Sequence, residues 1–363
     1  AHQGRFLAFA VYRATPTFDP GVPAVRFVTE VDGQELEASL ILVRPPVVLV
    51  HGTWSDPSTW KDFLPLCPSG TEATLHGAVG SVPAMDGYQV YVANYRPVNA
   101  HPFLQGANVL RVQVRQFLER ARLGGTAVTQ ADLVCHSLGG ILARRITEMD
   151  GYRNDEDYQA GRIRKLITIA TPHFGTYFAD AIPTPVDPAS PLGLLGTLIG
   201  FPIQFGVVED FQTDSPEIRG LPPATGVLCH SIVAVSPPLA EIERFSELGL
   251  FLFALSCLTS EPLEPTVHGL ATIVDVAFFA IFHAERHDWV VQESSAAGGL
   301  GGPQSTAFSG CMHFTVSDRI SRIVNIGAPQ DSRHRLGDRV CRRVVELPDA
   351  PPHSGAFAEG FPP

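Results

Sequence analysis

Ser137 is a serine whose surroundings favour a role as a nucleophile. It follows an apolar run, residues 131–135, that is typical of a short buried strand. It precedes a segment, residues 138–149, whose apolar side chains recur on one helical face. A strand-to-helix turn this tight exposes its central side chain at the carboxyl edge of a sheet. Cys135 takes the place of the first glycine in the G-x-S-x-G pattern, and a plain helix N-cap is the alternative interpretation of Ser137.

A serine nucleophile needs a general base, for which histidine is the natural choice, and an acid that orients the base. Where a nucleophile follows a strand in this way, the chain order is serine, acid, histidine. Asp288 precedes the apolar pair 290–291, and His313 lies far enough downstream for one strand to fit between the two. We therefore predict Asp288 as the acid and His313 as the base. The competing acids are Asp275 and Asp318, and the competing bases are His334 and His353.

The reaction also needs donors for the negative oxygen that develops on the attacked carbonyl, and preorganised backbone N–H groups serve best. Two positions offer such groups. Leu138 follows the nucleophile at a helix start, and Thr53 lies just after the apolar run 46–50. We expect His51 to order its loop through backbone hydrogen bonds and His136 to pack or bond locally.

The elements that position these residues alternate between strand and helix patterns, which indicates a mostly parallel central sheet flanked by helices. The expected core strands are residues 46–50, 88–93, 131–135, 165–170 and 227–235, and the expected helices are 106–122, 138–149 and 316–326. Residues 6–12, 25–31 and 36–43 have the pattern of an antiparallel lead-in.

Two segments are too long for simple connections and predict a cap or lid. The first is rich in proline and glycine, at 183–226, and the second lies between 236 and 286. The second contains the apolar stretches 248–258 and 270–282, both shorter than the roughly 18 to 20 residues that span a bilayer. These stretches form either a helical pair packed on the core or a mobile apolar cap that meets a lipid interface when open.

We thus predict three parts of the chain. They are an N-terminal β lead-in at 1–45, a catalytic domain at 46–328 with cap insertions at about 177–226 and 236–286, and a C-terminal tail at 329–363.

Composition sets further limits. The chain has 363 residues, of which 45% are hydrophobic and 17% charged, and this fits one large globular core. Its formal net charge of -11 argues against a nucleic-acid partner and against simple attraction to anionic membranes. The start at Ala1 leads us to expect a secreted or periplasmic protein, although a boundary chosen for expression would look the same.

The six cysteines show no C-x-x-C spacing, which disfavours a zinc site. Cys135 and Cys257 lie in apolar surroundings and are expected as buried free thiols. The sequence does not decide whether Cys67, Cys229, Cys311 and Cys341 form disulfide bridges.

Several motifs together resemble the successive landmarks of lipase-type α/β-hydrolases. They are Val50-His51-Gly52-Thr53, Asn94-Tyr95-Arg96, His136-Ser137-Leu138-Gly139-Gly140 with Ala143-Arg144, Thr171-Pro172-His173-Phe174-Gly175-Thr176, and Asp288-Trp289-Val290-Val291. They cover about residues 46–326. The resemblance implies an eight-stranded, mostly parallel sheet and hydrolysis of carboxylic esters through an acyl-enzyme. Members of this family usually carry glycine in place of Cys135, and commonly glycine in place of Trp289.

We therefore predict a serine ester hydrolase of the α/β-hydrolase fold, a lipase or esterase that needs no cofactor. Its partners would be small-molecule or lipid esters and, transiently, a lipid interface, with no nucleic acid and no transmembrane segment. An acyltransferase, a polyester hydrolase or an amidase would use the same triad. A non-catalytic lipid-binding module is the alternative from a different class.

Overall fold

The computed structural model describes residues 23–31, 33–41, 43–53, 55–60, 81–83, 89–182, 206–236, 276, 278–309, 313 and 357. Within these residues the main sheet has seven strands. They are β3 (Val47–Val50), β4 (Ser81–Pro83), β5 (Gln89–Ala93), β6 (Ala131–His136), β7 (Ile163–Ile169), β8 (Leu228–Val235) and β9 (Ser305–Ser309). Their order across the sheet is β4-β5-β3-β6-β7-β8-β9, and only β4 runs antiparallel to its neighbour.

The prediction of a mostly parallel sheet is confirmed, and five of the strands overlap the five expected ones. Every residue of β3 and β6 is buried, because a parallel strand in the middle of a sheet is covered on both faces. The chain between Asp288 and His313 contains β9, the strand for which the sequence spacing leaves room. The short edge strand β4 carries no pattern long enough to be recognised in the sequence.

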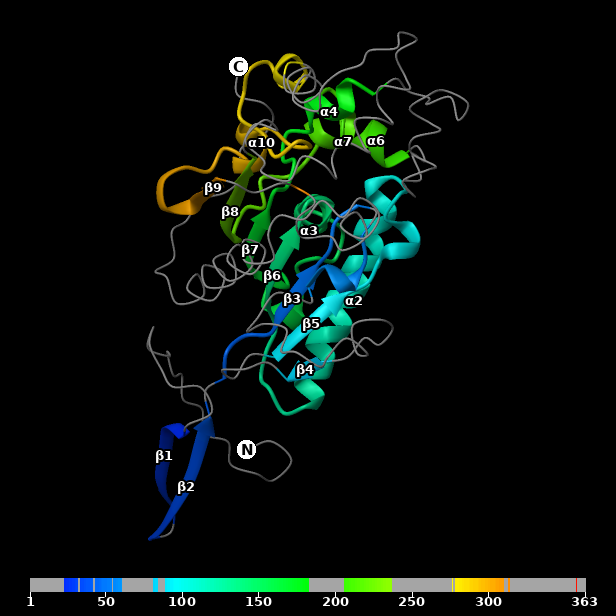
Figure 1. Cartoon of the computed structure of the whole chain (residues 1–363). Coiled ribbons are helices and arrows are strands. Elements are labelled where there is room, and N and C mark those ends of the chain that lie inside the picture. The colour runs from blue at the N-terminus through cyan, green and yellow to red at the C-terminus, as the bar shows by residue number, and fades with distance from the viewer. Residues whose placement is uncertain are drawn as a thin grey trace.

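Helices and short 3-10 turns connect the strands. The two longer ones are α2 (Phe103–Leu123) and α3 (Leu138–Ile146). The shorter ones are α4 (Tyr177–Asp180), α6 (Gly206–Asp210), α7 (Pro216–Arg219) and α10 (Glu293–Ala297), with 3-10 turns η1 (Pro57–Trp60), η3 (Arg96–Val98), η4 (Asp155–Asp157) and η6 (Gly302–Gln304). In Figure 1 the parallel strands stand side by side, and α4, α6 and α7 gather near one end of the sheet.

Helix α2 shows how the sequence specifies these elements. Its buried residues recur every three or four positions, so one face packs on the core. Gly106 on that face lets α3 approach, since a Cβ there would lie 2.8 Å from Leu142 Cδ1. The helix begins after Pro102, and its first N–H, that of Phe103, donates to the Asp210 carboxylate over 2.6 Å. A side chain from α6 thus satisfies a helix terminus 107 positions away.

An antiparallel hairpin precedes the main sheet. It consists of β1 (Pro23–Val31) and β2 (Gln34–Ile41), and it lies within the predicted lead-in. Gly33 in its turn has φ +73°, a conformation that glycine adopts without steric cost. In Figure 1 the hairpin lies apart from the main sheet, at the end of the molecule opposite α10. The predicted strand 6–12, the helix 316–326, and residues 183–205 and 237–275 of the predicted cap segments fall outside the described residues.

The core also contains a residue from the predicted C-terminal tail. Phe357 is only 2% exposed and belongs to the main hydrophobic cluster. Its ring stacks on that of His173 at a centroid distance of 4.0 Å, and its N–H donates to the Pro223 carbonyl over 3.1 Å. The buried thiols of Cys135 and Cys229 are both free, which confirms the expectation for Cys135 and takes Cys229 out of the possible bridges.

Candidate active site

The candidate residues leave neighbouring strands at one edge of the sheet. His51 follows β3, Ser137 follows β6, Thr171 lies just beyond β7, and Ser236 follows β8. All four strands are parallel, so these residues emerge at the same carboxyl edge. Catalytic groups of open α/β sheets gather at this edge.

Ser137 occupies the turn between β6 and α3, as the sequence predicts. Its backbone has φ 51° and ψ -123°, a combination of dihedral angles that residues other than glycine rarely adopt. The turn is fixed on both sides. The Ser137 N–H donates to the Ile169 carbonyl over 2.9 Å, and its carbonyl accepts from the Gly140 N–H and the Thr171 hydroxyl, each over 3.0 Å. Because the Ser137 side chain makes no capping hydrogen bond with α3, the plain N-cap interpretation is wrong.

Two glycines allow other backbone segments to lie directly against this turn. A Cβ on Gly52 would come within 2.9 Å of the Ser137 Cβ. A Cβ on Gly139 would lie 2.7 Å from the His51 carbonyl oxygen and 2.8 Å from that of Val50. Real Cβ atoms do not make such contacts, so the close fit of the β3 loop on the nucleophile turn depends on both glycines.

The structure brings Ser137, His313 and Asp288 together in series. His313 Nε2 lies 2.9 Å from the Ser137 Oγ, and His313 Nδ1 lies 2.8 Å from Asp288 Oδ2. The backbone N–H of His313 also donates to the Asp288 carbonyl over 3.0 Å, so that the histidine is bound to the acid twice. Exposure is 5% for Ser137 and His313 and 0% for Asp288, which keeps water from competing for these bonds.

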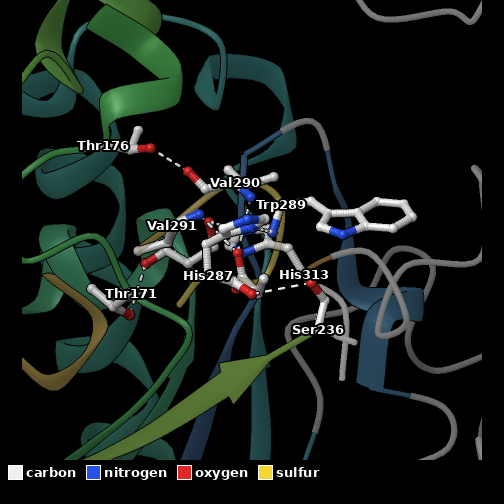
Figure 2. A network of polar contacts seen from close by, with 10 residues as sticks. Thr171, Thr176, Ser236, His287, Trp289, Val290, Val291 and His313 are labelled. Atoms are coloured by element: carbon white, nitrogen blue, oxygen red, sulfur yellow. Dashed lines mark hydrogen bonds and ion pairs between the residues drawn. The ribbon is translucent and has the colours of Figure 1, made fainter. Parts of the chain in front are cut away.

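Asp288 is held by the turn that follows it. Its Oδ1 accepts the N–H groups of Val290 and Val291 over 3.0 and 2.7 Å, which leaves Oδ2 for His313. The hydroxyl of Thr176 donates to the Val290 carbonyl, and Figure 2 shows this contact beside the network around His313. The turn is therefore tied to the segment after β7.

The residue before Asp288 is fixed in the same way. The N–H and the hydroxyl of Ser236, at the end of β8, donate to the His287 carbonyl over 2.9 and 3.1 Å (Figure 2). The contacts of Thr176 and Ser236 were not indicated by the sequence, because the partners lie 114 and 51 positions apart. The repeated threonines of the motif at 171–176 were the only signal that this segment supports the site.

The β3 loop carries the second group of candidates. His51 Nδ1 contacts the Gly52 carbonyl oxygen at 3.0 Å, and His51 Nε2 accepts the Tyr95 N–H over 3.3 Å. The Tyr95 ring stacks on the imidazole at 4.2 Å, and its hydroxyl donates to the His51 carbonyl. Burial lowers the pKa of His51 to about 4, although its hydrogen bond to Gly52 acts in the opposite direction. The expectation that His51 orders its loop is confirmed.

The predicted oxyanion residues are Leu138, which directly follows Ser137, and Thr53, which directly follows Gly52, the glycine in contact with Ser137. Leu138 is the first residue of α3, and Thr53 follows Gly52 in the β3 loop. The Thr53 hydroxyl oxygen is buried and has no hydrogen-bond partner in the part of the chain that the structure describes. A buried polar atom of this kind is suited to meet a polar atom of a ligand.

His136 directly precedes Ser137 and is 4% exposed. Its ring centroid is 5.0 Å from that of His313, with the two planes tilted by 42°. Burial, and then the neighbouring charge of His313, lower the pKa of His136 well below its usual range. His136 is therefore a neutral packing residue, as the sequence indicates. The competing candidates Asp275, Asp318, His334 and His353 all fall outside the described residues.

The geometry of this site agrees with a comparison of the whole chain with known families. The profile of the alpha/beta hydrolase family matches residues 47–322, which is most of the chain. The chain belongs to the alpha/beta hydrolase family. No curated protein matches this hydrolase.

Several solved structures are similar to the hydrolase in fold. They include Bacillus licheniformis lipase BlEst2 in mature form, with 16% identity, a TM-score of 0.44, and coverage of 90% of this chain and 99% of that one. EstA from Clostridium botulinum has 15% identity, a TM-score of 0.43, and coverage of 86% and 88%. Staphylococcus hyicus lipase has 13% identity, a TM-score of 0.36, and coverage of 83% and 96%.

In the described ranges, no group of three or more His, Cys, Asp or Glu side chains is arranged to hold a metal ion. Among the same residues, no helix has both the length and the apolar character required to cross a membrane.

Proposed function

We propose that this hydrolase cleaves carboxylic esters, as a lipase or esterase does, through an acyl-enzyme formed on Ser137. The observation that carries the proposal is the unbroken series of hydrogen bonds from Ser137 through His313 to Asp288. A hydroxyl, an imidazole and a carboxylate in this order are the groups that activate a serine for acyl transfer.

The positions of the protons follow from the partners. A carboxylate only accepts hydrogen bonds, so His313 Nδ1 carries the proton that lies on Asp288 Oδ2. A neutral imidazole has a single N–H, and Nε2 is therefore left as the acceptor that faces the Ser137 hydroxyl. The site thus holds its base in the tautomer that can remove the serine proton.

The reaction then proceeds in two halves. The Ser137 Oγ attacks the ester carbonyl as its proton moves to His313 Nε2, and Asp288 stabilises the imidazolium that forms. His313 gives the proton to the leaving alcohol, which leaves the acyl group on Ser137. A water molecule, deprotonated by His313, attacks the acyl group and restores the free serine.

The negative oxygen of the tetrahedral intermediate would be bound by the backbone N–H groups of Leu138 and Thr53. Leu138 stands at the start of α3, where N–H groups are directed out of the helix and the dipole favours negative charge. Thr53 directly follows Gly52, whose contact with Ser137 brings this part of the β3 loop against the nucleophile, and the Thr53 hydroxyl oxygen is buried and unpartnered among the described residues. Removal of one such donor costs about 10²- to 10³-fold in kcat.

The test is hydrolysis of a series of p-nitrophenyl esters from acetate to palmitate, with the S137A variant as the control. We expect turnover by the wild-type protein, none above the background of solution by S137A, and unchanged circular dichroism. An active-site phosphonate should label the wild-type protein at Ser137 and leave S137A unlabelled. If the folded wild-type protein neither cleaves these esters nor reacts with the phosphonate, ester hydrolysis is the wrong function.

Two further measurements specify the reaction. A rate that rises from butyrate to octanoate and beyond indicates a lipid substrate, whereas a fall indicates a small ester. Product analysis with and without an added alcohol separates hydrolysis from acyl transfer, because the two reactions differ only in which acceptor attacks the acyl-enzyme.

A further inference from the structure

Two phenylalanine rings pack on the two aromatic residues that flank Asp288, which are His287 and Trp289. Phe278 stacks on Trp289 at a centroid distance of 6.0 Å and an interplanar angle of 12°, and it lies 5.6 Å from the ring of His287. Phe282, one helical turn further on, stacks on His287 at 4.1 Å and 15°. One helical face thus contacts the residues before and after the acid.

Trp289 has an unusual backbone conformation for a residue of its size. Its φ is 79°, in the left-handed region that glycine adopts without steric cost and in which a residue with a bulky side chain is strained. This conformation bends the chain directly after Asp288. The Trp289 N–H donates to His287 Nδ1 over 3.1 Å, and the next two N–H groups, of Val290 and Val291, converge on Asp288 Oδ1. The strained residue therefore lies in the turn that aims the acid at His313.

A strained backbone persists only where other contacts hold it in place. The stack of Phe278 on the indole is such a contact, and the ring of His287 within the same cluster fixes the other side of the turn. Figure 2 shows the indole of Trp289 directed away from His313, so the indole does not contact the reacting atoms. Any effect of Trp289 on the chemistry must pass through the turn.

We infer that Phe278 and Trp289 are positioning residues, which hold the turn of Asp288 in the conformation that aims Oδ2 at His313. The inference rests on the proposed role of Asp288. Glycine adopts a left-handed conformation without strain. At position 289 the packing of Trp289 on Phe278 stabilises the same conformation for a bulky residue.

The experiment compares five single variants and one double variant of the full chain. W289A keeps the strained Cβ and removes the ring, W289G removes both, and W289F keeps a ring. F278A removes the other half of the stack. F279A is the matched control, since Phe279 is the neighbouring residue of the same type and is 63% exposed.

We expect W289A and F278A to lose about tenfold to a hundredfold in kcat, because small displacements of catalytic groups have effects of this size. KM should stay close to the wild-type value, since the acid does not bind substrate. W289G should recover most of the kcat because glycine adopts the turn without strain, and W289F should recover it because a ring remains. The double variant F278A/W289A should be no worse than the poorer single variant, as for residues that act through one contact.

Proton NMR of the protein without substrate gives a second readout. The hydrogen-bonded Nδ1 proton of His313 should give a low-field resonance in the wild type, F279A and W289G, and this resonance should shift or broaden in W289A and F278A. The signal does not require ester turnover, so it tests the positioning role even if S137A and wild type prove equally inactive. Wild-type kcat and an unchanged resonance in folded W289A and F278A would overturn the inference, as would a W289G variant no better than W289A.

Discussion

Gly52 and Ser137 lie in such close contact that a Cβ atom on Gly52 would come within 2.9 Å of the Ser137 Cβ. The same Cβ would lie 3.0 Å from His136 Nδ1. Neither neighbour can move away easily, because Ser137 forms the strained and hydrogen-bonded turn after β6 and His136 is the last residue of that buried strand. The absence of a side chain at position 52 therefore determines how closely the β3 loop approaches Ser137.

We predict that G52A lowers kcat by about tenfold or more, because either Ser137 or the Thr53 N–H must shift. The measurement is ester hydrolysis, with the thermal midpoint recorded beside it. G301A is the control, since Gly301 has an extended backbone and no atom within reach of an added Cβ. Wild-type kcat in a folded G52A protein would show that the contact does not set the position of the nucleophile.

The two carboxylate oxygens of Asp288 have different hydrogen-bond partners. The D288N variant therefore tests whether Asp288 fixes the tautomer of His313. An asparagine here would keep its carbonyl oxygen toward the N–H groups of Val290 and Val291, so its NH₂ group would face His313 Nδ1. The imidazole would then carry its proton on Nε2, the nitrogen that must accept the Ser137 proton. We predict a fall in kcat of about 10³- to 10⁴-fold without loss of the fold.

D155N is the control for D288N, because Asp155 is an exposed carboxylate in η4. It should retain wild-type kcat. Raising the pH should restore little activity to D288N, since the defect is in the tautomer. A D288N variant that keeps more than a tenth of the activity would require a different acid.

Much of this arrangement can be predicted from local patterns. The turn at Ser137 is marked by an apolar strand that runs into an amphipathic helix, and chain order selects Asp288 and His313. A local pattern is enough for Ser137 because it directly follows a recognisable strand. Asp288 and His313 are selected by chain order and by a spacing that leaves room for one strand, β9, between them. The hydrogen bonds that join the three residues, and the catalytic roles proposed for them, come from tertiary geometry.

Other features have no local signal. The stack of Tyr95 on His51 joins residues 44 positions apart, and the left-handed backbone of Trp289 contradicts the preference of a bulky side chain. Phe357 lies among prolines and small or polar residues, a composition typical of an exposed tail, and yet it is buried. These features depend on packing between distant segments, which periodicity in the sequence does not record.

Phe357 should contribute strongly to the stability of the hydrolase. Its ring is stacked on His173, and the Arg144 guanidinium carbon lies 5.0 Å from the ring centroid. We predict that F357A lowers the free energy of unfolding by about 3–5 kcal/mol, as for other buried phenylalanines. Urea denaturation measures the change. L123A is the control, because Leu123 is 83% exposed and its loss should cost no more than about 0.5 kcal/mol.

The buried Arg144 is a second reason for Phe357 to contribute to the stability of the folded protein. The arginine is 1% exposed, and its guanidinium donates to the carbonyls of His173, Leu221 and Pro222. Burial lowers its pKa to about 10, so it stays charged at neutral pH beneath the Phe357 ring. F357L should therefore destabilise the protein, because leucine fills part of the volume without an aromatic face for the cation. Equal stability of F357L and wild type would show that the aromatic face of Phe357 contributes nothing to the stability of the folded protein.

His51 makes the stability of the hydrolase depend on pH, with a sign that follows from its pKa. Burial lowers that pKa from the usual 6.5 to about 4 in the folded protein. Between these two values the unfolded chain binds a proton that the folded protein excludes, so acid favours unfolding. The contribution of His51 is complete above pH 6.5 and is lost as the pH falls toward 4, with a full size of roughly 3 kcal/mol.

The H51Q variant tests this prediction because glutamine does not titrate and its amide oxygen can still accept the Tyr95 N–H. At pH 7 we expect H51Q to be less stable than wild type, since the stack on Tyr95 is lost. Between pH 6.5 and 4 the wild type should lose more free energy of unfolding than H51Q, so the two curves converge. The buried His173 is present in both proteins and cancels in the difference, and the pKa of the buried His136 is lowered mainly by burial, with the charge of His51 as its smallest cause. Parallel curves over this range, measured by urea denaturation at each pH, would show that His51 is protonated as readily in the folded protein as in the unfolded chain.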